Sequence, residues 1–414
     1  MTDGAWIARG SIPKFLVKGE TMVSSHASRS DPSRSDPWRV GVLFSRAGLT
    51  AVTETEHFLG TALAIQEINQ AGGVLGREIE VVAYDPESDP VTYRRLADRL
   101  LTEDGISVIF GCSSSSQRKA VLPAIERRNG LLWYPSLYEG FEYSPNVIYT
   151  GASPNQNSFP LAEYLVCNHG RRVFLVGSDY VYPRESNRIM RDLVECYGGE
   201  IVDEVYVPMD AAEPSLRDLI ARIKEAAPNV VFSTVVGRAA QSFYRLYREA
   251  GLDPASLPIA SLTMAEGEVQ VIGAALCEGH ITAATYFASL PAAGNRRFTD
   301  DFRRAFGPDR PISMWSAGAY AQVRLFAMAL ERAGTLDTQR LVEAALGLSF
   351  EAPEGTIRID PDNNHTWLTP RIGRLRRDGG FDVIWEAKAA VKPDPYLAVS
   401  PLGARWIGDE VPVS

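Results

Sequence analysis

Hydroxyl and phenol side chains follow the apolar runs of this sequence, at the points where predicted strands end. Ser115 belongs to a serine run after one such strand, and Ser136 comes two residues after Tyr134 at the end of the next. These groups offer hydrogen-bond donors, acceptors and aromatic area, which together suit a small, partly polar ligand. We therefore predict a ligand site formed by Ser115, Tyr134, Ser136, Tyr180, Tyr182, Thr234 and Thr263.

The serine run at 113–116 admits more than one interpretation. It lies between a predicted strand and a predicted helix, where backbone N–H groups and hydroxyls can hold a carbonyl oxygen or an anion, but serines there also serve simply as helix N-caps. Ser116 and Lys119 match the S-x-x-K nucleophile motif, yet the S-D-N and K-T-G partner motifs are missing from the sequence. A serine without an identifiable base is not activated, so we predict no catalytic residue and no enzyme.

Tyr180 and Tyr182 flank Val181 with a period of two. In an extended loop this spacing points both phenols to the same side. Together with Tyr134 they would form an aromatic box around a ligand, and as core tyrosines they would instead only fill space.

Metal and cofactor chemistry finds little support. The histidines are scattered without H-x-x-H or H-E-x-x-H spacing, and the stretch that begins at Asp360 has His365 and Arg371 where a calcium loop needs glycine and glutamate. The 4 cysteines form no CxxC pair, which indicates buried thiols rather than disulfides or a zinc site. We predict no metal and no cofactor.

The elements that position these residues alternate short β-branched runs with amphipathic helical stretches from Trp38 onward, the pattern of parallel sheets covered by helices. One series ends near Tyr149 and a second begins at Val173. The pattern predicts an α/β protein with two lobes, whose strand-to-helix loops converge on a cleft.

The composition of the chain argues against several other classes of protein. A chain of 414 residues is long enough for two domains, and its formal charge of −9, with no long basic block, argues against direct nucleic-acid binding. No apolar stretch approaches the roughly 18–20 residues of a membrane span. Residues 1–37 lack the apolar core of a signal peptide, so they predict a disordered leader or a misplaced start codon, and a cytoplasmic protein.

Several longer blocks of the sequence resemble those of a known protein family. They include Tyr138-Glu139-Gly140-Phe141-Glu142, Pro154-Asn155-Gln156-Asn157, Gly177-Ser178-Asp179-Tyr180-Val181-Tyr182 and Phe232-Ser233-Thr234-Val235-Val236-Gly237. From about Trp38 to about Pro395 the chain resembles the amide- and urea-binding branch of the type I periplasmic binding proteins, and in particular the cytoplasmic amide sensors that regulate aliphatic amidase operons.

The resemblance implies a two-lobed fold with three interlobe crossovers and a ligand between mainly parallel sheets. We expect the first lobe at 38–150 with 279–345, the second at 151–278 with 346–398, and a tail at 399–414. The ligand residues of these sensors match Ser115, Tyr134, Ser136 and Tyr180. Ser113 and Ser114 stand where the sensors have larger side chains, which predicts a wider pocket.

The resemblance thus implies a sensor of a short-chain aliphatic amide or a urea-like molecule. It allows for a homodimer, and for an RNA-binding antiterminator that is released when the ligand binds. One alternative is the substrate-binding protein of a urea or short-chain amide ABC transporter, which would be periplasmic. The other is an amidase that uses Ser115 or Ser116.

Overall fold

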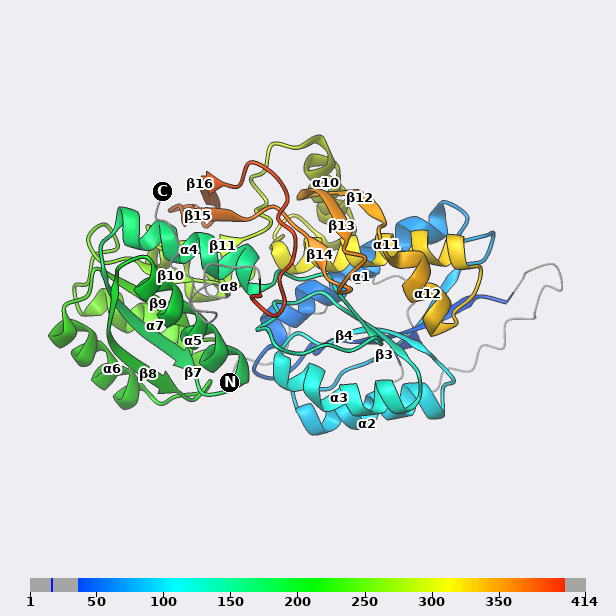
Figure 1. Cartoon of the computed structure of the whole chain (residues 1–414), viewed down its shortest axis with the longest axis horizontal. Coiled ribbons are helices and arrows are strands. Elements are labelled where there is room, and N and C mark those ends of the chain that lie inside the picture. The colour runs from blue at the N-terminus through cyan, green and yellow to red at the C-terminus, as the bar shows by residue number, and fades with distance from the viewer. Residues whose placement is uncertain (1–15, 18–35, 399–414) are drawn as a thin grey trace.

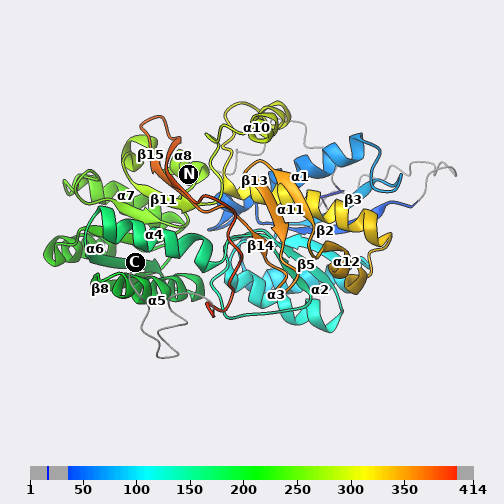
Figure 2. The ribbon, with the colours of Figure 1, turned by 45° about the horizontal axis from the view of Figure 1, so that its top comes forward.

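The structure, a computed structural model, describes residues 16–17 and 36–398. It has two α/β lobes side by side along its long axis, with the chain between about 285 and 370 returning to the first lobe (Figure 1). A view turned by 45° shows the same division, with the segment from β14 to β15 running from one lobe to the other (Figure 2). The predicted two-lobed fold is confirmed.

The first lobe is built on a parallel sheet. In spatial order its strands are β1 (Leu16–Val17), β3 (Ile79–Tyr84), β2 (Trp38–Leu43), β4 (Val108–Gly111), β5 (Leu131–Tyr134) and β6 (Val147–Tyr149). Its helices are α1 (Ala51–Gln70), α2 (Pro90–Thr102), α3 (Ser115–Arg127), α10 (Ala293–Phe306), α11 (Met314–Ala333) and α12 (Thr338–Ala345). Helices α2 and α3 cover one face, while α1 and α11 cover the other (Figure 1).

Strand β2 shows why the sequence folds this way. Val40 and Val42 pack with the α1 and α11 side chains, whereas Leu43 packs with those of α2 and α3. Both faces of a parallel sheet are buried, so its strands read as continuous apolar runs. Helix α1 approaches α11 closely at Gly60, where an added Cβ would lie 2.1 Å from the Ser316 carbonyl oxygen.

The second lobe has a mixed sheet. In spatial order its strands are β16 (Phe381–Glu386), β15 (Arg371–Leu375), β11 (Ile281–Ala284), β10 (Ile259–Ser261), β9 (Val230–Thr234), β7 (Arg172–Ser178) and β8 (Glu200–Val207). The strands from β11 to β8 are parallel, while β15 and β16 are antiparallel additions. Its helices are α4 (Pro154–Asn168), α5 (Val181–Cys196), α6 (Glu213–Ala226), α7 (Arg238–Glu249), α8 (Glu266–Ile272) and α9 (Ala274–Cys277).

A small antiparallel sheet of β12 (Ser349–Ala352), β13 (Gly355–Ile359) and β14 (Thr366–Trp367) lies beside the first lobe. Within the described residues the chain therefore crosses between lobes at 150–153, 285–292 and 368–370. The three crossovers implied by the resemblance are confirmed.

Two predicted boundaries need correction. The predicted first lobe includes 279–345, but β11 pairs with β10, so the second crossing comes after Ala284. The predicted second lobe includes 346–398, but His365 forms a bridge to Tyr149 of the first lobe, so the last crossing comes after Trp367. A strand belongs to the sheet with which it shares hydrogen bonds, and these long-range pairings decide both boundaries.

The predicted leader at 1–37 lies mostly outside the described residues. Residues 16–17 and 36–37 of this stretch are described, and Leu16–Val17 pairs in parallel with Val82 and Ala83, so these two residues do not follow the prediction of disorder. The predicted tail at 399–414 also lies outside the described residues.

Candidate ligand-binding site

A cavity of about 200 Å³ lies between the lobes, at the carboxyl ends of the parallel strands. The first lobe contributes the loops after β2, β4 and β5, the starts of α1 and α3 and one residue of α11. The second lobe contributes the loops after β9 and β10, the starts of α5 and α7, and residues of α8. Because both lobes line it, its size and its access to solvent depend on how the two lobes are placed relative to each other. The predicted cleft is therefore present in the described residues.

Five of the seven predicted ligand residues line this cavity, and they are Ser115, Ser136, Tyr180, Tyr182 and Thr263. The other two, Tyr134 and Thr234, are fully buried and do not line it. The hydroxyl of Tyr134 donates to the carbonyl oxygens of Leu137, at 3.1 Å, and Ser113, at 3.3 Å. Tyr134 thus supports the loops that form the cavity wall, and a direct role in binding stays a prediction.

Thr234 occupies a comparable place in the second lobe. Its hydroxyl lies 3.4 Å from the Val176 carbonyl oxygen and 3.4 Å from the Asn187 side-chain oxygen, within the layer between β9 and α5. Its position at the end of a strand does not turn its side chain toward the cleft.

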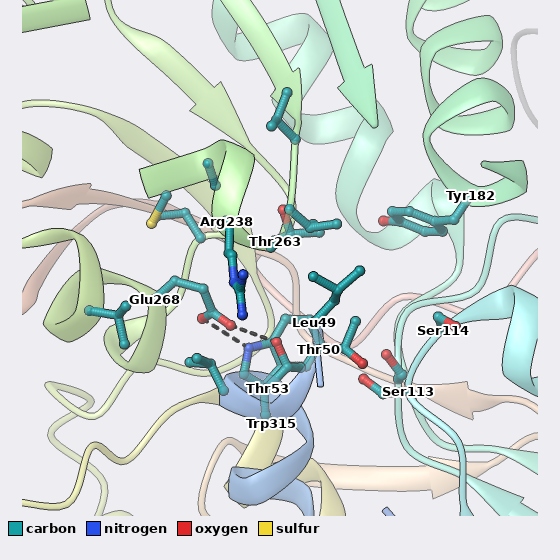
Figure 3. A pocket seen from close by; sticks show the side chains of 18 of the residues that line it. Leu49, Thr50, Thr53, Ser113, Ser114, Tyr182, Arg238, Thr263, Glu268 and Trp315 are labelled. Atoms are coloured by element: carbon teal, nitrogen blue, oxygen red, sulfur yellow. Dashed lines mark hydrogen bonds between the residues drawn. The ribbon is translucent and has the colours of Figure 1, made fainter. Parts of the chain in front are cut away.

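The serine run leads into the start of α3, and some of its backbone N–H groups already donate hydrogen bonds within the protein. The side-chain oxygen of Gln117 accepts hydrogen bonds from the N–H groups of Ser113, at 2.8 Å, and Ser114, at 2.9 Å, while the Ser114 hydroxyl accepts one from Gln117 N–H at 3.3 Å. This capping box satisfies donors that the sequence offered to a ligand. The N-cap interpretation of Ser114 is confirmed, and the side chains of Ser113 and Ser114 still face the cavity (Figure 3).

A buried ionic network lies behind Ser115. The Ser115 hydroxyl donates to Glu139 Oε2 at 2.5 Å, and Arg118 Nη2 donates to both oxygens of Glu139, at 2.8 and 3.0 Å. Arg118 Nε also donates to Glu142 at 2.7 Å. Burial alone would lower the pKa of Arg118, but attraction to Glu139, Tyr134 and Glu142 raises it well above its ordinary value.

The tyrosines of the second lobe reach the cavity by a different geometry from the one predicted. Tyr180 is the N-cap of α5 and Tyr182 lies in its first turn, so the segment is helical and not an extended loop. Figure 3 shows the Tyr182 ring directed into the cavity toward Thr263. Burial raises the pKa of both phenols, which keeps them protonated as hydrogen-bond donors.

Tyr182 has unused hydrogen-bonding capacity. The Tyr182 hydroxyl makes no hydrogen bond of normal geometry with a described residue. Ser186 lies close to this hydroxyl and lowers the pKa of Tyr182, but burial raises that pKa by more. An unpaired buried hydroxyl is costly, so a ligand atom that pairs with it would gain affinity.

The opposite end of the cavity carries charge that the sequence pattern did not reveal. Glu268 accepts hydrogen bonds from the Thr53 hydroxyl, at 2.6 Å, and the Trp315 indole N–H, at 3.3 Å (Figure 3). Arg238 lines the same end, and its side chain forms no ion pair or hydrogen bond with another described residue. Arg238 follows β9 by four residues and could have been found by the strand-end rule, whereas Trp315 and Glu268 lie on helices and gave no such signal.

The described residues contain no group of three or more His, Cys, Asp or Glu side chains that could hold a metal ion. The 4 cysteines are free thiols in this part of the chain; Cys112 and Cys277 are buried as predicted, whereas Cys167 is exposed and Cys196 is half-buried. No described helix is both long enough and apolar enough to cross a membrane.

Two relatives found by comparison with known proteins are both named as binding proteins. The chain is 26% identical over 295 residues to the Leu/Ile/Val-binding protein homolog 6 of Brucella melitensis, covering 69% of this chain and 75% of that protein. It is 24% identical over 310 residues to the leucine-, isoleucine-, valine-, threonine-, and alanine-binding protein of Pseudomonas aeruginosa, covering 73% of this chain and 80% of the relative.

A solved structure shares the fold. The solute binding protein of an ABC transporter from Rhodopseudomonas palustris BisB5, in complex with 3,4-dihydroxy benzoic acid, matches with a TM-score of 0.78 and 24% identity, covering 86% of this chain and 99% of that one. These comparisons confirm the expected binding-protein family, while the amide-sensor branch stays a prediction. The family model described as the periplasmic binding protein domain matches residues 38–402, so this chain belongs to that family.

Proposed function

We propose that this protein is the solute-binding protein of an ABC transporter, and that it closes its two lobes on one small molecule. The observation that supports this most directly is the cavity between the lobes, which combines hydroxyls with apolar walls and is lined from both sides. The relatives named above are binding proteins, and the solved structure belongs to a transporter of this kind. This transport function is the alternative that the resemblance left open. It implies that the protein is located in the periplasm.

For the ligand we propose a solute with an amide-type polar head and an apolar body. Hydroxyls of Ser113, Ser114, Tyr180 and Tyr182 can pair with such a head, while Leu137 and its apolar neighbours can hold the body. A cavity of about 200 Å³ exceeds what urea or acetamide fills, since one water molecule needs only about 10–15 Å³ on a comparable measure. Amides with a longer apolar substituent are therefore preferred to both.

Two other functions are less well supported. A cytoplasmic sensor that releases an antiterminator would use the same cavity, but none of the relatives named above is a regulator. An amidase would need a base beside its serine. The acidic partner of Ser115 is Glu139, whose two carboxylate oxygens already accept hydrogen bonds from Arg118.

Binding and transport can be tested together. A thermal-shift screen of small amides, ureas, amino acids and aromatic acids should find a stabilising solute, and small-angle scattering should show the lobes closing on it. Deletion of the gene should then reduce uptake of that solute by cells. Unchanged uptake together with altered amidase expression would instead support the sensor.

The site assignment has a matched pair of variants. Tyr180→Phe removes a hydroxyl from the cavity wall and should weaken binding about 5- to 150-fold, the equivalent of about 1–3 kcal/mol for an unpaired buried partner. Thr234→Val removes a hydroxyl behind the wall of the same lobe and should leave affinity unchanged. Equal effects of the two substitutions would contradict the assignment.

A further inference from the structure

The proton of the Ser115 hydroxyl is committed within the protein. Ser115 lines the cavity and its oxygen lies 2.5 Å from Glu139 Oε2, which is a short hydrogen bond to a carboxylate. A serine hydroxyl has one proton to donate and two lone pairs that accept. With the proton directed at Glu139, only the lone pairs of the Ser115 oxygen remain for a ligand atom.

Glu139 cannot reverse this hydrogen bond. Its carboxylate accepts from Arg118 at 2.8 and 3.0 Å and lies 3.6 Å from Lys119 Nζ, and a paired carboxylate has no proton of its own to donate. If Ser115 turned its proton toward a ligand, two oxygens bearing lone pairs would face each other at 2.5 Å inside a buried region. The orientation is therefore fixed by charge as well as by geometry.

Arg118 is itself held in place. It is fully buried, its guanidinium lies 4.7 Å from the centre of the Tyr134 ring and 5.3 Å from that of Tyr138, and Glu142 accepts from its Nε at 2.7 Å. Because these contacts enclose the guanidinium, Glu139 keeps the same partner whether or not the cavity is filled.

The neighbouring serines differ from Ser115. The Ser114 hydroxyl accepts from Gln117 N–H, and neither its proton nor that of Ser113 is directed at another described residue. Both side chains can therefore donate to an acceptor atom of the ligand. One rim of the cavity thus offers a fixed acceptor beside rotatable donors, the pattern that a carboxamide complements with its NH₂ and its carbonyl oxygen.

We propose that Glu139 is a positioning residue that makes Ser115 an obligate hydrogen-bond acceptor, so that the ligand must present an N–H or O–H donor at Ser115. This inference rests on the proposed function and specifies the polarity of its ligand head. A carboxamide, a urea or an ammonium group satisfies Ser115. A carboxylate placed there would set its oxygens against the Ser115 lone pairs.

Matched pairs of ligands that differ only in the head test the proposal. Butyramide against butyrate, and benzamide against benzoate, are titrated by calorimetry into the full chain and into the Ser115→Ala and Ser114→Ala variants. Ser115→Ala should weaken binding of the amides about tenfold and leave the acids unchanged, because only the amides donate to Ser115. Ser114→Ala should not produce this selective loss, since Ser114 donates.

Glu139→Gln provides the test of positioning. The glutamine can donate its NH₂ to Ser115 and so free the serine proton, which should reduce the ratio of amide to acid affinity about tenfold. That ratio is insensitive to a general loss of folded protein. Should this variant fail to fold, the Ser115→Ala comparison decides the proposal alone.

Three results would overturn the inference. The first is a Ser115→Ala variant that loses acid binding more than amide binding. The second is a folded Glu139→Gln variant with an unchanged ratio of amide affinity to acid affinity. The third is that no amide binds to the unmodified chain. If acids or other solutes still bind and close the lobes, the proposed transport function survives while the polarity is wrong. If no solute binds at all, the proposed function fails as well.

Discussion

Three carboxyl groups meet where the lobes face each other, and they should make the stability of the protein fall as pH rises. Glu56 comes from α1 of the first lobe, while Glu266 and Glu268 come from the first turn of α8 in the second. The side chain of Glu56 accepts a hydrogen bond from Ser313, and the Glu266 side chain accepts one from Ala288 N–H at 3.0 Å.

Burial is the main cause of the raised pKa of each of these groups. It raises the pKa of Glu266 to about 7 and, together with repulsion from Glu268, raises that of Glu56 well above the ordinary 4.5. Neighbouring His57 gives no compensating charge, since burial lowers its pKa to about 3. The Arg238 side chain lines the same cavity as Glu268 but forms no ion pair with these three described groups.

The direction and size follow from linkage. A folded-state pKa above the unfolded value means that the contribution is fully present below about pH 4.5 and is lost as pH rises through about 7. For Glu266 the difference corresponds to about 3 kcal/mol. The protein should therefore unfold at a lower temperature at about pH 8 than at about pH 5, by the order of 5 °C from this group.

The assay is thermal unfolding of the wild type and Glu266→Gln from about pH 5 to about pH 8. Glu354, whose pKa burial also raises to about 7, adds a slope of the same sign, so the difference between the two proteins is the quantity to compare. Glu266→Gln should flatten the slope, while the exposed control Glu225→Gln should not. A variant slope identical to that of the wild type would refute the reasoning.

The remaining predictions concern packing and buried charge. Glu139→Leu leaves Arg118 buried without its main partner and should lower the free energy of unfolding by about 3–5 kcal/mol, measured by chemical denaturation, and a loss below about 1 kcal/mol would contradict this. Gly60→Ala should destabilise strongly because its Cβ would lie 2.1 Å from the backbone oxygen of Ser316. Its control, Gly318→Ala on α11, meets its nearest atom at 3.6 Å and should be neutral or stabilising by up to about 1 kcal/mol, so equal melting temperatures for the two variants would disprove the packing argument.

Local sequence patterns sufficed for much of the fold. The strands Ile79–Tyr84, Leu131–Tyr134 and Val230–Thr234 coincide with largely apolar runs of the sequence, because each strand is buried on both faces. Pairing between distant segments was beyond such patterns. The antiparallel pairing of Ile281 with Arg374 joins residues whose short strands carry no mark of their partner.

The rule that ligand residues follow strands was useful at the site but incomplete. Ser136 and Thr263, which follow their strands, line the cavity as the rule predicts, and their contact with a ligand stays a prediction. Tyr134, the last residue of β5, does not line the cavity, because the pleat places its side chain in the layer between the sheet and α2 and α3. The rule misses Glu268, because helix packing brings that side chain to the cavity.

The hydrogen-bond polarity of Ser115 could not be read from its own neighbourhood in the sequence. A serine is both donor and acceptor, and which role faces a ligand depends on where its single proton is held. Here the proton is held by Glu139, a buried carboxylate 24 positions away that does not line the cavity and that forms an ion pair with Arg118. A change of ligand class could therefore arise at Glu139 with every residue of the cavity wall unaltered, so comparing wall residues alone would assign such a variant the wrong ligand.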